Sequence, residues 1–325
     1  MQNVLTVPHV HMAGPAVRVR CPALKVRASE WVILAFMIYA AAMAMVLPVA
    51  PSVRNLVVLL NLAVVLACAV PIYLDTHKGR LALSVMRDWM PLALTLVAYR
   101  EMGWFATPRH DHALEAHWVA WDRLILRGGA KAAIESFGPL LPSVLEIAYA
   151  LVYALAPFSI AVLYLYGKRA QTNRFLFVFA AGVLLCYAQF PFWPSEPPRV
   201  VFVGQDSPSM VTIFRQFNLW MLGACGIHTS VFPSAHVGGA FSTAFGMWKL
   251  LPEHKWVRRF LLAMAVLIAV ATVYGRYHYA TDVAGGLLMA TVAVLLGALV
   301  ERRRVAPGEM SNEEEDQPYV STRVA

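Results

Sequence analysis

Two short segments of the sequence place a histidine next to groups that can bind or transfer phosphate. FPSAHVGGAFS contains Pro233, Ser234 and His236 directly before an apolar stretch. Proline and serine are typical of a helix start, where backbone N–H groups without intrahelical partners favour an anion such as phosphate. A histidine in that first turn can give a proton to a departing oxygen. The alternative is an ordinary capped helix with a solvated histidine.

The segment VYGRYHYATDVAGG contains Arg276, His278 and Asp282. A carboxylate four residues after a histidine reaches the imidazole where the turn between them is helical. It would fix the tautomer, stabilise the charged ring and leave the other nitrogen free to attack. Arg276 offers a planar fork of donors for phosphate oxygens. The alternative is an interfacial belt of Arg, Tyr and His at a helix end.

A third segment, FPFWPSEPPRVVF, has four prolines that stiffen the chain and hold Arg199 at low entropic cost. We expect all three segments on the same membrane face. Together they offer two arginines, two histidines, a serine, an aspartate and a helix N-terminus. That set of groups suits phosphoryl transfer through a histidine better than it suits a metal centre.

The composition indicates which elements must position these residues. Hydrophobic residues make up 59% of the 325 residues and charged residues 14%, against roughly 45–50% and 25% in soluble domains. We therefore expect an all-α, polytopic membrane helix bundle. At about 20 apolar residues per crossing, eight stretches qualify: 31–50, 55–74, 81–99, 141–166, 175–193, 232–251, 257–275 and 282–300. Arg87 and Asp88 lie inside the third, where paired charges facing the bundle are tolerable; alternatively, Arg87 could snorkel toward the near surface.

Charge predicts the orientation. With the N-terminus inside, 18 of the 27 Lys and Arg residues lie on the inner side and nine on the outer side. The positive-inside rule then places both termini in the cytoplasm and the three polar segments outside or in a lumen. The net charge of +8 is explained by a basic surface against anionic lipid, so nucleic acid is not an expected partner. Four scattered cysteines (Cys21, Cys68, Cys186 and Cys225) form neither a disulfide framework nor a zinc site.

Two further stretches are predicted to lie outside the bilayer. HALEAHWVAWDRLIL, residues 112–126, is amphipathic and is expected to lie on the membrane surface. Residues 306–325 are polar, acidic and proline-bearing, and are expected to form a disordered tail.

The three segments resemble the signature motifs of the type 2 phosphatidic acid phosphatase superfamily. FPSAH is similar to the second motif and HYATD, with its His-x3-Asp spacing, to the third. The resemblance spans about residues 81–300, which implies the family's six-helix catalytic core. Residues 31–80 would add two helices in front, with a cytoplasmic segment over 1–30 and the tail over 301–325. EPPR and the arginine two residues before His278 are more similar to the subgroup that contains fungal inositol phosphorylceramide synthase.

The resemblance implies roles for residues, but no cofactor. His278 would be the nucleophile, Asp282 its orienting partner and His236 the general acid and base. Ser234 and Arg199 would bind phosphate. Two departures are visible: the family's arginine six residues before the motif histidine is Thr272 here, and the lysine of the first motif is absent near Arg199. We assign phosphate binding to Arg276 in place of the missing arginine, with Arg215 as a helper.

Other polar residues carry weaker hypotheses. His110, Asp111, His112, Glu115, His117 and Asp122 invite a metal site, but His112, His117 and Asp122 recur every five residues and leave one helix face, so we expect no metal. Glu146 lies inside a predicted span and, with Tyr149 and Tyr153 on roughly the same helix face, could line a pocket for an alcohol acceptor. The alternative is a carboxyl hydrogen-bonded within the bundle.

The sequence therefore predicts a membrane enzyme that attacks a lipid phosphate or phosphodiester through a phosphohistidine. With water as the acceptor it is a phosphatase, and with an alcohol it is a head-group transferase. The alternative class is a non-catalytic binder or transporter of lipid phosphates, although binding alone would not need both histidines and Asp282.

Overall fold

The computed structural model describes residues 23–106 and 111–305, and within them every regular element is a helix. Each of the eight predicted spans corresponds to a helix or a bent pair of helices. They are α1 (Ala28–Val46), α2 (Pro51–Lys78), α3 (Leu81–Met102), α6 (Leu140–Ala150) with α7 (Val152–Leu165), α8 (Thr172–Gln189), α11 (Ala235–Leu250), α12 (Lys255–Tyr274) and α13 (Ala280–Val305). The predicted tail over 306–325 lies outside the described residues.

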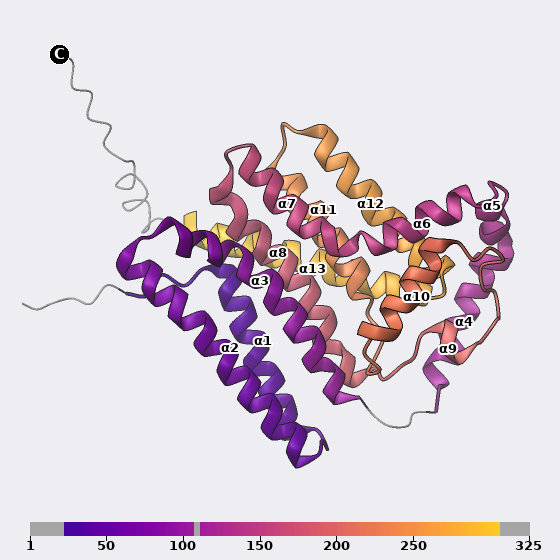
Figure 1. Ribbon diagram of the computed structural model, residues 1–325, viewed down its shortest axis with the longest axis horizontal. Helices are drawn as coiled ribbons and strands as arrows, with labels where there is room; N and C mark the ends of the chain where they lie inside the picture. The colour runs from indigo at the N-terminus through magenta and orange to yellow at the C-terminus, as the bar shows by residue number, and fades with distance from the viewer. Residues whose placement is uncertain (1–22, 107–110, 306–325) are drawn as a thin grey trace, which may run out of the picture.

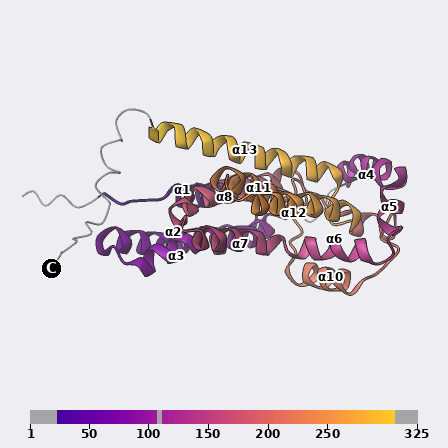
Figure 2. The same ribbon diagram turned by 90° about the horizontal axis from the view of Figure 1, so that it is seen from above.

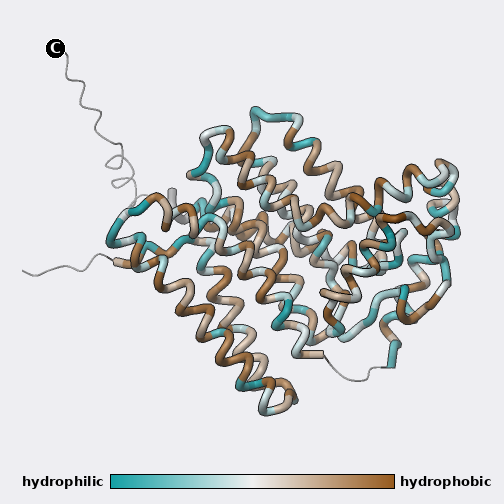
Figure 3. The backbone as a smooth tube through the Cα atoms, in the orientation of Figure 1, coloured by the Kyte–Doolittle hydropathy of each residue, from teal (hydrophilic) through white to brown (hydrophobic). Residues whose placement is uncertain are grey.

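The lengths and hydropathy of these helices are those of an integral membrane protein. Six are long and apolar enough to cross a membrane, and the pair α6–α7, bent by 64° after Ala150, raises the number to seven. In Figure 3 the hairpin of α1 and α2 is brown, and so hydrophobic, over most of its length. The predicted polytopic helical bundle is therefore confirmed.

α11 has 16 residues and is the shortest of the helices that correspond to single predicted spans. It packs against α7, α8, α12 and α13, and most of its side chains are buried. Because neighbouring helices surround it, α11 does not need the length of a helix that faces lipid along its whole course.

Glycines allow α8, α11 and α13 to approach closely. A Cβ atom at Gly238 of α11 would lie 2.7 Å from Sγ of Cys186 on α8, and one at Gly286 of α13 would lie 2.5 Å from the carbonyl oxygen of Ser234. A Cβ atom at Gly239 of α11 would likewise lie 3.1 Å from Cγ2 of Val183 on α8. Gly238 and Gly239 therefore allow a neighbouring helix to pack closely against α11.

Short helices gather at the end of the bundle where α11 and α13 begin and α12 ends (Figures 1 and 2). We call this end of the bundle the site end. They are α4 (Ala113–Ile125), α5 (Lys131–Glu135), α9 (Pro198–Val201) and α10 (Ile213–Cys225). α4 is the amphipathic segment expected on the membrane surface. Its outer face exposes the apolar side chains of Trp121, Leu124 and Ile125.

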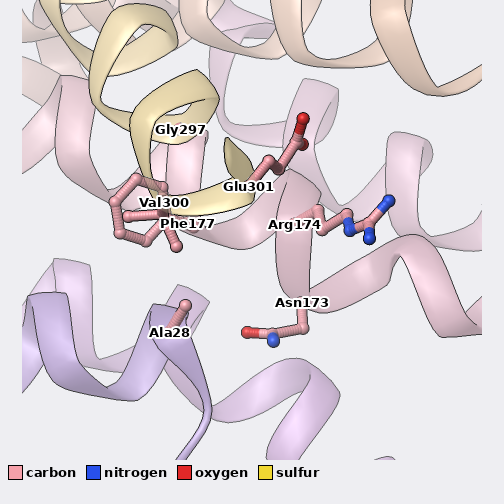
Figure 4. Close-up of a pocket in the computed structure, with 7 residues that line it drawn as sticks. All are labelled: Ala28, Asn173, Arg174, Phe177, Gly297, Val300 and Glu301. Carbon is pink, nitrogen blue, oxygen red and sulfur yellow. The ribbon is translucent and has the colours of Figure 1, made fainter. Parts of the chain in front are cut away.

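Ion pairs join the first three helices at the opposite end. Arg87 of α3 bonds Glu30 of α1 at 2.7 Å and Asp75 of α2 at 2.6 Å, and Asp88 pairs with Arg27 at 2.6 Å. The charges inside the third span are thus paired with residues of other segments within the bundle. A pocket at this end is lined by residues of α1, α8 and α13, among them Asn173, Arg174 and Glu301 (Figure 4).

Candidate active site

The start of α11 forms the floor of the site. Ser234 is its N-cap, and the Ser234 hydroxyl accepts a hydrogen bond from the N–H of Val237 at 3.4 Å. The N–H of Ser234 in turn donates to the carbonyl oxygen of Asp282 at 3.0 Å. The cap predicted from the Pro-Ser sequence is therefore present, and a backbone hydrogen bond joins it to the first turn of α13.

The connection between α12 and α13 reverses the chain within five residues. Gly275 is required there, because a Cβ atom would lie 2.3 Å from the ring of Tyr277. Arg276 has a φ of 61°, in the left-handed region that a residue with a Cβ atom occupies at some cost. The N–H of His278 is fixed by the carbonyl oxygen of Thr272 at 3.0 Å. As a result, the side chains of Arg276, Tyr277 and His278 contact Asp122, Glu146 and Asp282, respectively.

The imidazole of His278 has a defined tautomer. Its Nδ1 lies 3.0 Å from the carbonyl oxygen of Val231 and 3.2 Å from Oδ2 of Asp282. Because a carbonyl oxygen only accepts, the proton belongs on Nδ1 and the lone pair on Nε2. The contact between His278 and Asp282 that the four-residue spacing predicted is present. The same Asp282 oxygen accepts from the N–H of Tyr279 at 2.9 Å.

The two motif histidines face each other. Nε2 of His278 lies 3.4 Å from Nδ1 of His236, and Nε2 of His236 lies 3.4 Å from the hydroxyl of Tyr153. With the lone pair on His278, the consistent assignment puts the His236 proton on Nδ1 and lets Tyr153 donate to Nε2. Tyr149 stacks on the His236 ring at 4.9 Å between centroids. Sequence reasoning did not identify Tyr153 as a partner of His236, although the Tyr149–Tyr153 spacing placed both on one helix face.

Arg199 supplies positive charge beside the histidines. Its backbone N–H donates to the carbonyl oxygen of Arg276 at 3.2 Å, and its guanidinium lies 5.7 Å from the ring centroid of Tyr277. Burial and the charge of Arg199 lower the pKa of His278, which keeps that imidazole uncharged at neutral pH. Among the described residues, no carboxylate forms an ion pair with Arg199.

Arg215 lies nearby but has a counter-ion. It is buried and bonds Glu146 at 3.0 Å, and the other Glu146 oxygen accepts from Asn218 at 2.7 Å and from the Tyr277 hydroxyl at 2.5 Å. Glu146 thus has the environment of a carboxyl hydrogen-bonded within the bundle. Tyr149, by contrast, borders His236. Their predicted role in an acceptor pocket remains a prediction.

Arg276 is fully buried on the side of the turn that faces α4. One of its NH groups pairs with Asp122 at 2.5 Å. The structure therefore brings His278, Asp282, His236, Ser234 and Arg199 together, while Arg276 and Arg215 each have a carboxylate partner.

The histidine and acidic side chains in and around α4 contact several different segments and do not converge on one point. Within 23–106 and 111–305 there is no group of three His, Cys, Asp or Glu residues arranged to hold a metal; His110 lies outside these residues. Glu115 and Asp122 instead bond backbone groups of other segments at the site end.

These features define an integral membrane protein with a paired-histidine site at the end of its helix bundle. The PAP2 superfamily pattern matches residues 129–296, just over half of the chain, and the chain belongs to this superfamily.

A curated relative adds a shorter likeness. A PA-phosphatase related-family protein of Dictyostelium discoideum is 36% identical over 66 residues, which cover 20% of this chain and 11% of the relative. The chain thus matches only a small part of that relative's length. No solved structure matches the chain.

Proposed function

We propose that this protein transfers a phosphoryl-type group from a lipid phosphate or phosphodiester through His278, at the outer or lumenal face of its membrane. The observation that carries the proposal is the contact between Nε2 of His278 and Nδ1 of His236, with Asp282 behind the first ring. One nitrogen has a lone pair for attack and the other has a proton for the leaving group. A protein that only binds lipid phosphates would not need this arrangement of a lone pair and a proton.

The two rings perform complementary steps. A substrate phosphate enters between them and replaces their mutual contact. With the anionic substrate bound, His236 takes up a second proton and becomes an imidazolium. The bond from His278 Nε2 to phosphorus forms as the bond to the leaving oxygen breaks, and the Nδ1 proton of His236 passes to that oxygen and leaves the His236 ring neutral. Water or an alcohol then attacks phosphorus, gives its proton to His236 and releases His278. Asp282 stabilises the positive charge that His278 gains on attack.

The charge balance of the site favours a phosphodiester over a monoester. Arg215 is paired with Glu146 and Arg276 with Asp122, so Arg199 is the guanidinium near the histidines without a carboxylate partner in the described part of the chain. A phosphate monoester carries about −1.5 to −2 charges at neutral pH, whereas a diester carries one. One unpaired guanidinium matches the diester, which supports head-group transfer as in the inositol phosphorylceramide synthase subgroup. Fixed guanidinium charge also removes the need for a metal.

A matched pair of substrates tests the proposal. Purified protein in vesicles is given a lipid phosphate monoester or a lipid phosphodiester with the same acyl chains, with and without a long-chain alcohol, in excess chelator. We expect faster turnover of the diester, release of its diacylglycerol and, with the acceptor present, transfer of the phosphorylated head group to the alcohol as a new diester. His278→Asn is the control and should be inactive.

The other outcomes are separable. Turnover of the monoester alone, with release of inorganic phosphate, would contradict the charge argument and leave a phosphatase. Loss of activity in chelator, restored by zinc or magnesium, would contradict the metal-independent mechanism. Binding of both lipids without any turnover would replace the enzyme by a binding protein.

A further inference from the structure

One face of α4 contacts each of the three segments that form the site. Glu115, Trp118 and Asp122 are spaced by three and four residues, so their side chains lie on one side of the helix. Glu115 and Asp122 are fully buried, and Trp118 is half-buried. Figure 2 shows α4 at the site end, beside the start of α13.

The first two of these side chains bind the proline-rich segment and the start of α11. Oε1 of Glu115 accepts a hydrogen bond from the N–H of Glu196 at 3.0 Å, three residues before the site arginine. The Trp118 ring stacks on Phe232 with centroids 5.2 Å apart, two residues before the cap of α11. Trp118 also meets the edge of Tyr279, the residue after the nucleophile, at 5.7 Å.

Asp122 contacts the connection between α12 and α13 on both sides of His278. Its Oδ2 pairs with Arg276 at 2.5 Å, and its Oδ1 accepts from the N–H of Ala280 at 2.8 Å. Arg276 is two residues before His278 and has the left-handed backbone conformation of the turn. Ala280 begins the helix that carries Asp282. A single carboxylate therefore bonds both ends of the loop that contains the proposed nucleophile.

Asp122 is the charged partner of Arg276 in the described part of the chain. Nε and the second NH group of Arg276 have no hydrogen-bond partner among the described residues. Within the described residues, Asp122 is the carboxylate that forms an ion pair with this buried guanidinium. A buried charge that loses its partner is strongly unfavourable, so the loop is expected to rearrange when Asp122 is neutralised.

We infer that α4 is a positioning helix, in which Glu115, Trp118 and Asp122 hold the three site segments at their working separation. These side chains contact the site segments and not the reacting atoms. α4 ends at Ile125, before the matched superfamily pattern begins at residue 129. The unit that this chain needs for activity therefore includes α4 as well as the matched residues. The kinetic part of this inference rests on the proposed function, but its structural part does not.

Two substitutions on the inner face and one on the outer face test the inference. Asp122→Asn keeps an oxygen for the N–H of Ala280 and removes the charge, while Trp118→Leu removes the ring contacts. His117→Gln is the control on the same helix, because His117 is exposed and its ring Nδ1 bonds the carbonyl oxygen of Ala113 within its own helix. Hydrogen–deuterium exchange is measured in the full-length protein, and kcat and KM are measured on the substrate that the wild type turns over.

We expect Asp122→Asn to increase exchange selectively at residues 276–283, and Trp118→Leu to do so around residues 231–236 and 278–280. Because small displacements of reacting groups cost on the order of 10²-fold in rate, kcat should fall about 10- to 100-fold while KM stays within about threefold. Asp122→Glu should recover part of kcat, and His117→Gln should match the wild type in every measurement.

Unchanged exchange at these segments in both inner-face variants would overturn the inference, as would an equal effect of His117→Gln. If Asp122→Asn does not fold, Trp118→Leu decides the result alone. Selective exchange changes in a wild type without turnover would leave the positioning role intact and contradict the proposed function instead.

Discussion

Arg215 and Glu146 form a buried ion pair, with 3.0 Å between a guanidinium nitrogen and Oε1, between α10 and α6. The Tyr277 hydroxyl shares the same carboxylate. The pair thus fixes the amphipathic helix α10 against the bent helix pair and against the residue before His278. Arg215 is therefore occupied by a protein carboxylate.

Replacing one member of this ion pair should destabilise the protein more than expected from replacing both members together. Arg215→Leu or Glu146→Leu leaves one buried charge without its partner, which costs about 3–5 kcal/mol. The double variant leaves neither charge, so we expect its loss of stability to be smaller than the sum of the two single losses. Thermal unfolding of the purified variants in one detergent measures this. Additive losses would mean that the two side chains act independently.

Arg199 should be the arginine on which catalysis depends most directly. Removing one preorganised donor to a developing phosphate charge typically costs 10²–10³-fold in rate, so Arg199→Ala should lower kcat/KM by about that factor. Arg199→Lys keeps the charge but loses the planar fork and should recover only part of the rate.

Arg127→Gln is the matched control. Arg127 is an exposed arginine at the same end of the bundle, paired with Asp206 at 2.8 Å, and surface pairs contribute little. A similar loss in both variants would indicate a general effect of surface charge and not a phosphate contact at Arg199.

The sequence predicted those parts of the site that depend on local spacing. Asp282 reaches His278 because four residues separate them across the start of a helix, and Ser234 caps α11 because proline and serine precede an apolar run. The three motif segments, which were expected on one membrane face, lie together at the site end.

The partners of the arginines were not predictable in this way. Asp122 is 154 residues from Arg276, and Glu146 is 69 residues from Arg215. No local pattern relates residues at such separations, so only the packing of α4 and α6 against the site end reveals which guanidinium groups are neutralised. The same holds for Tyr153, whose hydroxyl meets His236 from the far side of the α6–α7 bend.

The rate at which a substrate with a radioactive phosphate labels His278 should fall only at a pH below the pKa of a free imidazole. Burial and Arg199 lower the pKa of His278, so its attacking nitrogen stays unprotonated as the pH falls through about 6.5. With a substrate whose leaving group needs no proton, labelling at pH 5.5 should be close to that at pH 7, where an ordinary imidazole would lose about tenfold.

Rapid-quench labelling across this pH range, in the wild type and in Arg199→Gln, makes the measurement. Removing the Arg199 charge should move the acid limb to higher pH, because a positive neighbour disfavours the protonated ring. An acid limb at 6.5 in both proteins would contradict this electrostatic coupling.

The orientation in the membrane can be tested at Cys225, an exposed cysteine at the end of α10 on the site end. The 18-to-nine charge distribution predicts that a membrane-impermeant thiol reagent labels it in intact cells. Cys68 and Cys186 are buried and should not compete. Labelling of Cys225 only after permeabilisation would reverse the orientation and place the site in the cytoplasm.

The two histidines should fail in different ways when substituted. His278→Ala removes the attacking nitrogen, so it should abolish both turnover and labelling by a substrate with a radioactive phosphate. His236→Ala removes a proton donor and acceptor, which typically costs 10²–10⁴-fold, but leaves Nε2 of His278 in place. With a good leaving group, His236→Ala should still accumulate the intermediate, because departure then needs no proton.

Asp282→Asn separates orientation and charge from attack. The amide keeps the shape of the carboxylate but loses the counter-charge for the imidazolium, so this variant should be slow with every leaving group. The label trapped by denaturation should be acid-labile and base-stable, as expected for a phosphoramidate. A label on Ser234 or on a carboxylate, or one that persists in His278→Ala, would mean that a different nucleophile operates within the same superfamily site.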